Sequence, residues 1–153
     1  AYATDAQDMG GGSGDAKALT LESGSGNLYA KLDVYGTFSM STVNILYLDT
    51  DNNKNTGYYG GGWPNFGAEY RIVYSNGFNP PKLQSFSGGS QGSDSWTDVS
   101  VLSGAFSGGS AEVCIPYSSI GKSAGSVIKL LFRPGQDAAP DFWQSTKPTY
   151  TLK

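Results

Sequence analysis

The stretch NLYAKLDVY, residues 27–35, alternates apolar and polar side chains. One face carries four aliphatic residues, Leu28, Ala30, Leu32 and Val34. The opposite face carries Tyr29, Lys31, Asp33 and Tyr35. Because a strand points successive side chains to opposite sides, this pattern predicts a β-strand with one buried face.

The rest of the chain repeats short apolar runs between turn-forming residues. We predict further strands at residues 17–22, 43–49, 69–74, 82–86, 96–102, 111–116, 127–133 and 149–152. The Gly/Ser-rich residues 87–95 are expected to form a long hairpin tip. Pro80 and Pro81 are expected to interrupt the chain before the next strand, and Gly121 to stop a single helical turn.

These elements decide the fold class. The 153 residues include 22 glycines, few charged residues and no helical stripe of useful length. Short strands separated by Gly, Ser, Asn and Pro turns are typical of two packed antiparallel sheets. We predict an all-β fold, a single-domain antiparallel β-sandwich that is jelly-roll-like and spans residues 1–153.

Charge and residue usage exclude several functions. The net charge is −3 and Lys and Arg do not cluster, so nucleic-acid binding is not expected. No apolar run is long enough to span a membrane. The chain has no histidine, which excludes a Ser-His-Asp triad and histidine zinc sites. The single cysteine, Cys114, is predicted to be a small buried hydrophobe.

An oxygen-rich loop follows the strand at residues 43–49. Asp49, Asp51 and Asn53 alternate along the chain, which allows their side chains to converge, and Asn55 offers a further oxygen. Calcium takes six to eight oxygen ligands at about 2.3–2.6 Å and tolerates irregular geometry. The alternative is an Asx-rich turn without metal. An EF-hand is excluded because Lys54 replaces its glycine and no glutamate follows at the twelfth position.

Aromatic residues next to this loop are candidates for sugar binding. Trp63 lies between glycines and Pro64, and Tyr58, Tyr59 and Phe66 could extend a stacking platform. Rigid aromatic rings suit the apolar faces of sugars because they lose little conformational entropy on binding. The alternative is that Trp63 folds back as a lid over the end of the sandwich.

A second group of candidates lies near the C-terminal end. Trp143 has Arg133, Gln136 and Asp137 nearby in sequence as polar partners for a sugar. Its alternative role is to plug one end of the fold. Three residues have weaker cases: Trp96 is expected in the core, whereas Tyr29 and Tyr35 either form a flat platform or cover the sheet. Asp5, Asp8 and Asp15 are expected to form a solvated turn.

Four segments, taken in order, resemble a known family. They are NLYAKLDVYG (27–36), NILYLDTDNNKNTGY (44–58), GGWPNFGAEYRIVY (61–74) and AEVCIPYSSIG (111–121). Together they resemble the family 9-like carbohydrate-binding (DOMON-like) β-sandwiches of secreted bacterial proteins. The resemblance places Glu69 at the acidic position of the strand after the loop, and bound calcium is usual in related sandwiches. Residues 134–153 show no matching motif.

The resemblance implies a function. We expect a secreted, non-catalytic module that binds polysaccharide or oligosaccharide and carries a structural calcium ion at Asp49, Asp51, Asn53, Asn55 and Glu69. Such modules are often attached to a larger polysaccharide-active enzyme, and we expect a monomer that contacts neither nucleic acid nor membrane. One alternative is an accessory domain for protein interaction. The other is a small glycoside-active enzyme, although Glu22, Glu69 and Glu112 lie in no catalytic motif.

Overall fold

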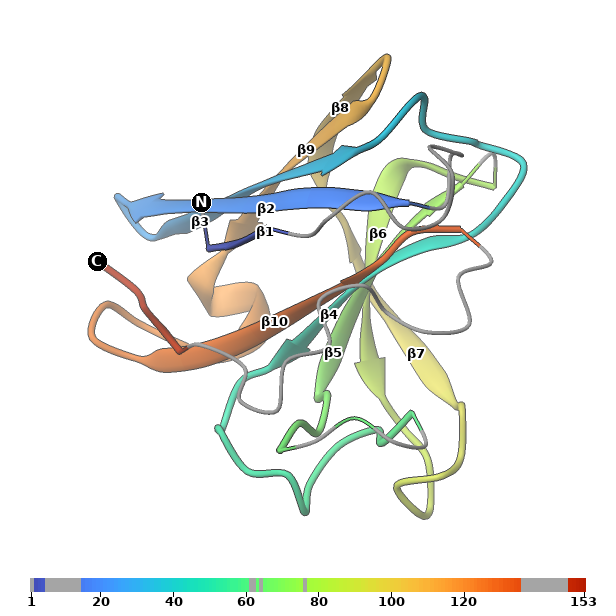
Figure 1. The fold of residues 1–153 in the computed structure, drawn as a ribbon. Helices are drawn as coiled ribbons and strands as arrows, with labels where there is room; N and C mark the ends of the chain where they lie inside the picture. Colours follow the sequence, from blue (N-terminus) through green and yellow to red (C-terminus); the bar gives the residue numbers. More distant parts are fainter. Residues whose placement is uncertain (1, 5–14, 61–62, 64, 76, 136–148) are drawn as a thin grey trace.

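Two antiparallel sheets pack face to face (Figure 1). The computed structural model describes residues 2–4, 15–60, 63, 65–75, 77–135 and 149–153. The five-stranded sheet has the order β1 (Ala3–Thr4), β2 (Ala16–Gly24), β3 (Asn27–Val34), β9 (Ser110–Pro116) and β8 (Ser103–Ser107). The six-stranded sheet has the order β11 (Tyr150–Thr151), β10 (Val127–Arg133), β4 (Asn44–Asp49), β5 (Tyr70–Ser75), β6 (Phe78–Phe86) and β7 (Trp96–Val101). The all-β sandwich prediction is confirmed.

The main core lies between the two sheets. In β3, the aliphatic face predicted from the alternation is buried, and Leu28 and Leu32 are fully inaccessible. Leu46 and Leu48 of β4 face it from the other sheet. Burial of such side chains is worth about 1.5–3 kcal/mol each, so this interface dominates the stability of the fold.

The chain changes sheet at a few connections. It crosses after β3, after β7 and after β9, where the 3₁₀ helix η1 (Tyr117–Ile120) lies on the path to β10. Tyr117 is buried, and its hydroxyl donates to the carbonyl of Lys153 at 2.8 Å. No helix in the described residues is long and apolar enough to cross a membrane.

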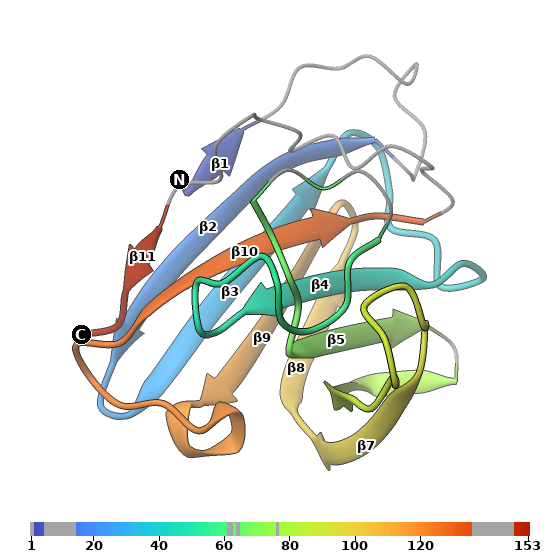
Figure 2. The same cartoon turned by 90° about the horizontal axis from the view of Figure 1, so that it is seen from below.

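A second, smaller core covers the outer face of the six-stranded sheet. Residues 50–69 connect β4 to β5, and the described part of this connection (50–60, 63 and 65–69) lies on the side of this sheet away from the five-stranded sheet (Figure 1). Seen from below, the connection lies in front of β4 (Figure 2). The buried residues of this second core are Ile45, Tyr47, Trp63, Phe66, Ala68 and Leu131. The side chains on the outer face of β4 are therefore buried from solvent, as are those on its inner face.

Three strands differ from the predictions. Strands β1 and β8 were not predicted, because β1 has only two residues, and the sequence SGAFS of β8 is short, contains glycine and pairs only with β9 at the sheet edge. Strand β6 begins at Phe78, so Pro80 and Pro81 do not delay it as expected. The pairing of β6 with β5 shifts register across these prolines, so their missing amide donors interrupt no regular ladder.

Candidate metal centre and the adjacent pocket

The loop at residues 50–69 is closed by short-range contacts. Tyr58 and Ala68 form an isolated antiparallel bridge, with N–H to carbonyl distances of 2.7 and 2.9 Å. Two glycines allow this closure. Gly57 has a φ of +65°, and a Cβ on Gly67 would lie 2.0 Å from the carbonyl oxygen of Thr56. The loop therefore returns the chain directly beside the end of β4.

This closure brings three carboxyl groups together. Asp49 ends β4, Asp51 follows in the loop and Glu69 precedes β5, and one oxygen from each lies within 4.8 Å of the others. Asp49 is 0 % exposed. Glu69 accepts a hydrogen bond from the Thr50 amide at 2.7 Å, which fixes it across from Asp49. We call these three residues the acidic triad.

Two oxygen atoms of the acidic triad are buried without a donor. Within the described residues, Asp49 Oδ2 and Glu69 Oε1 accept no hydrogen bond. Burial raises the pKa of both carboxyl groups above its usual value, and the neighbouring charge of Asp51 adds to the increase. Lys129, opposite Asp49 on β10, partly offsets this for Asp49. A buried carboxylate oxygen without a donor is costly, and a bound cation would satisfy both of these oxygens.

The amide residues of the predicted metal set have other contacts. The Asn53 amide N–H bonds to Asp51 Oδ1 at 2.9 Å and to Asp49 Oδ1 at 3.3 Å. Asn53 Oδ1 in turn accepts from the Asn55 amide at 3.1 Å. These bonds are those of the Asx-rich turn named as the alternative, and they occur together with the acidic triad. Three acidic residues that could hold a metal ion are thus arranged by the turn itself.

Trp63 does not offer a free stacking face, contrary to expectation. It is 3 % exposed, and its ring centroid lies 4.7 Å from that of Tyr47 and 5.7 Å from that of Phe66. The reason is the apolar outer face of β4 and β10, where Ile45 and Leu131 need cover. Trp63 therefore folds back as in the alternative interpretation, but it covers the outer face of the six-stranded sheet rather than the end of the sandwich.

Tyr58 and Tyr59 differ in exposure although they are adjacent. Tyr58 packs edge-on against Trp63 at 5.5 Å between ring centroids and is only partly exposed. Tyr59 is 39 % exposed and lines a pocket of about 450 Å³. The other lining residues are Lys54, Asn55, Trp63, Asn65 and Gln91. We call this the loop pocket.

Gln91 was not predicted and closes one side of the loop pocket. It lies in the hairpin tip at residues 87–95, and its amide donates to the carbonyls of Lys54 at 2.9 Å and Thr56 at 3.0 Å. The main-chain carbonyl of Gln91 accepts a hydrogen bond from the main-chain N–H of Tyr59 at 2.8 Å. No local sequence signal connects residues so far apart, because only the pairing of β6 with β7 brings the tip to the loop.

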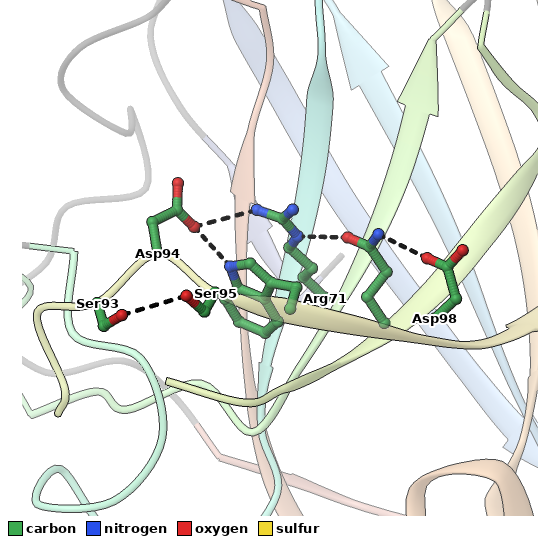
Figure 3. A network of polar contacts seen from close by, with 7 residues as sticks. Arg71, Ser93, Asp94, Ser95 and Asp98 are labelled. Atoms are coloured by element: carbon green, nitrogen blue, oxygen red, sulfur yellow. Dashed lines mark hydrogen bonds and ion pairs between the residues drawn. The ribbon is translucent and has the colours of Figure 1, made fainter. Parts of the chain in front are cut away.

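A polar network borders the second core on its outer side (Figure 3). The guanidinium group of Arg71 lies 4.6 Å from the Trp96 ring centroid and donates to Gln84 at 2.7 Å. Asp94 accepts from Arg71 at 3.3 Å and from the Trp96 indole at 2.5 Å, and Gln84 donates to Asp98 at 2.8 Å. Trp96, expected in the core, is half-buried at its margin, where the network holds it.

The remaining predicted residues have varied positions. Arg133 ends β10 opposite Ile45 and is not among the residues that line the loop pocket. Gln136, Asp137 and Trp143 lie outside the described residues, as do Asp5 and Asp8.

Two predictions about burial are wrong. Asp15 is buried rather than solvated, because its carbonyl accepts from the Tyr35 amide where β2 begins. Cys114 is half-buried on the outer face of β9, because strand alternation turns Val113 and Ile115 inward instead.

Comparisons with known proteins found no relative. No family model matches the sequence, and no curated protein or solved structure matches the chain. The family resemblance therefore stays a prediction.

Proposed function

We propose that the chain is a non-catalytic, extracellular carbohydrate-binding module, similar to the family 9-like sandwiches, in which calcium braces the loop at residues 50–69. The observation that carries the proposal is the position of the loop pocket. Asn55 and Tyr59 line it, and both belong to the loop that the acidic triad closes. An ion at the triad would fix the shape of the pocket.

Calcium is the cation that suits the acidic triad best. Asp49, Asp51 and Glu69 offer only oxygen atoms, which are ligands of hard cations, whereas zinc prefers nitrogen and sulfur. Calcium accepts irregular sets completed by carbonyls and water, which an irregular loop supplies more easily than the octahedron of magnesium. When bound, the ion would neutralise the buried carboxylates and hold β4 to β5. Its role in the proposal is structural.

The loop pocket has the residue types that bind sugars. The exposed ring of Tyr59 offers a flat apolar face, and Asn55, Asn65 and Gln91 offer amide groups near it. Amides both donate and accept, which matches sugar hydroxyls. The volume of about 450 Å³ lies within the range of about 300–1,000 Å³ usual for small-molecule pockets. A saccharide unit or chain end is the ligand we assign.

Affinity electrophoresis tests the sugar assignment. Wild-type protein should be retarded in gels that contain a bound glycan, chosen from a panel of soluble cellulose, xylan, mannan and mixed-linkage glucan derivatives. Tyr59→Ala should lose at least tenfold in affinity, because stacking on an aromatic ring is the main apolar contact. Tyr59→Phe keeps the ring and should retain most of the affinity. Absence of retardation on every glycan would overturn the proposal, and equal retardation of Tyr59→Ala would exclude the loop pocket.

A second candidate function is docking to another protein domain. It is favoured by edge strand β7, on which Val99 and Val101 are exposed. Exposed apolar residues on a strand edge are typical of protein contact. Stable association with a neighbouring domain, lost in Val101→Lys and accompanied by no glycan retardation, would support this candidate over the first.

A further inference from the structure

The outer face of the five-stranded sheet contains a groove that the proposed function does not use. Its volume is about 480 Å³, and its lining residues come from β2, β3, β8 and β9. It shares no lining residue with the loop pocket, whose residues come from the loop after β4 and from Gln91, so the two sites are separate. A groove of this size lies within the usual range for ligand sites.

Strand register explains the shape of the groove. One row across the sheet contains Glu22, Tyr29, Cys114 and Ser103. The next row contains Thr20, Lys31, Glu112 and Ala105. Strand β3 thus contributes two long side chains and β2 and β9 one each, whereas β8 contributes only small ones. The small side chains leave space beside Tyr29 over the floor of the sheet.

Tyr29 provides a free aromatic surface in this groove. Its side chain is 47 % exposed, and within the described residues its ring contacts no other aromatic ring or cation. By contrast, the rings of Trp63 and Tyr58 pack against other aromatics of the same chain. A ring that is fixed on a central strand and open to solvent can stack on a flat ligand at small entropic cost.

The charges in the groove favour a neutral ligand rich in hydroxyl groups. In the described part of the chain, the carboxylates of Glu22 and Glu112 take part in no hydrogen bond or ion pair. Lys31 lies opposite Glu112 in the ladder but pairs instead with Asp33, at 3.6 Å. Two free carboxylates accept hydrogen bonds from hydroxyls and repel anionic ligands.

The position of the groove disfavours an extended peptide. Peptides that bind sheets usually add a strand at an exposed edge, where free main-chain groups are available. Here β3 and β9, at the centre of the groove, are paired on both sides, whereas the edge strand β8 lies at its margin. Recognition over the centre of the groove therefore comes from side chains, namely one aromatic ring and two carboxylates, which can together stack on a sugar ring and accept hydrogen bonds from its hydroxyls.

We infer that this groove is a second glycan-binding site, in which a neutral oligosaccharide stacks on Tyr29 and donates hydroxyl hydrogen bonds to Glu22 and Glu112. The inference takes its ligand class from the proposed function but depends on different residues. Two sites on opposite faces would let one module contact two chains of a polysaccharide, which increases the apparent affinity through effective concentration.

Cys114 gives this inference a specific test. It is the only cysteine in the sequence, and it lines the groove beside Tyr29. Its rate of reaction with Ellman's reagent is therefore a probe of groove occupancy. Cellohexaose, xylohexaose, mannohexaose and laminarihexaose are added one at a time. At ten times the dissociation constant, a bound oligosaccharide should slow the reaction about tenfold, as the free fraction falls.

Variants separate the two sites. Protection of Cys114 should be lost in Tyr29→Ala, retained in Tyr29→Phe and retained in Tyr59→Ala. Calorimetry on Tyr29→Ala and Glu112→Gln gives the affinity directly and also applies if the thiol reacts too slowly to follow. The expected loss in affinity is at least tenfold in Tyr29→Ala and threefold or more in Glu112→Gln.

Three results would overturn the inference. The first is that no neutral oligosaccharide protects Cys114, that Tyr29→Ala binds the oligosaccharides as tightly as wild type does, and that Tyr59→Ala abolishes binding. In that case the proposed function holds without a second site. The second is protection by hexagalacturonic acid equal to that by neutral sugars, which would contradict the role of the carboxylates. The third is protection by hexalysine only, which would assign the groove to a basic peptide.

Discussion

Replacement of Trp63 by alanine distinguishes a core residue from a sugar-stacking residue. The ring is 3 % exposed and contacts Tyr47 and Phe66 in the second core. Removal of a buried Trp costs about 3–5 kcal/mol. We expect the lower end, about 3 kcal/mol, because the core lies under a loop that can partly collapse into the space.

The assay for Trp63→Ala is urea and thermal unfolding. For a chain of this length, about 3 kcal/mol corresponds to a decrease in melting temperature of roughly 6–12 °C. Trp63→Phe should cost less than half as much, and Tyr59→Ala, a change at an exposed ring, should lie within about 0.5 kcal/mol of wild type. A Trp63→Ala protein that is as stable as wild type but has lost all glycan binding would refute the assignment of Trp63 to the second core.

Three further predictions concern the acidic triad and its loop. Chelation with EDTA should lower the melting temperature by roughly 5–11 °C when calcium was present at one hundred times its dissociation constant, since such a ligand stabilises by about 2.7 kcal/mol; Glu69→Gln should not respond. In chelated protein, the raised pKa values of Asp49 and Glu69 mean that their contribution to stability is complete below about pH 4 and is lost as pH rises through the folded-state values. Urea midpoints should therefore fall more in wild type than in Glu69→Gln as the pH rises above about 4, and equal slopes would contradict the shifts. Gly67→Ala should destabilise the protein by more than 1 kcal/mol and weaken calcium binding, because its Cβ would lie 2.0 Å from a backbone oxygen; unchanged unfolding would contradict the close contact.

The sandwich could be predicted from sequence because its strands alternate clearly. The pattern at residues 27–35 gave the correct buried face of β3, since each side chain in a strand has only two possible directions. The second core could not be predicted in the same way. Strand β4 is buried at every position, so periodicity does not show that Tyr47 faces away from the main core.

The candidate site was partly predictable for a related reason. Asp49 and Asp51 are close in sequence, so their spacing alone indicated a shared site. Glu69 is far along the chain and was placed there only by the family resemblance; the pairing of β4 with β5 brings it close. Gln91 reaches the loop pocket through a still longer connection and left no signal in the sequence.

The groove on the five-stranded sheet was only partly predictable. The outward direction of Tyr29 followed from alternation, and its use as a platform was one of two alternatives. The depth beside it depends on Ser103 and Ala105 of β8, one of the two strands that were not predicted. Recognition of the groove therefore required the three-dimensional pairing.

The calcium stoichiometry of the purified chain tests the central claim most directly, which is that the acidic triad holds an ion that braces the loop. Metal-free protein is titrated with calcium chloride in a calorimeter, alongside Asp49→Asn and Glu69→Gln. We predict one ion per chain in wild type and at least a tenfold weaker site in each variant. Absence of calcium binding in wild type, or binding that both variants leave unchanged, would contradict the claim.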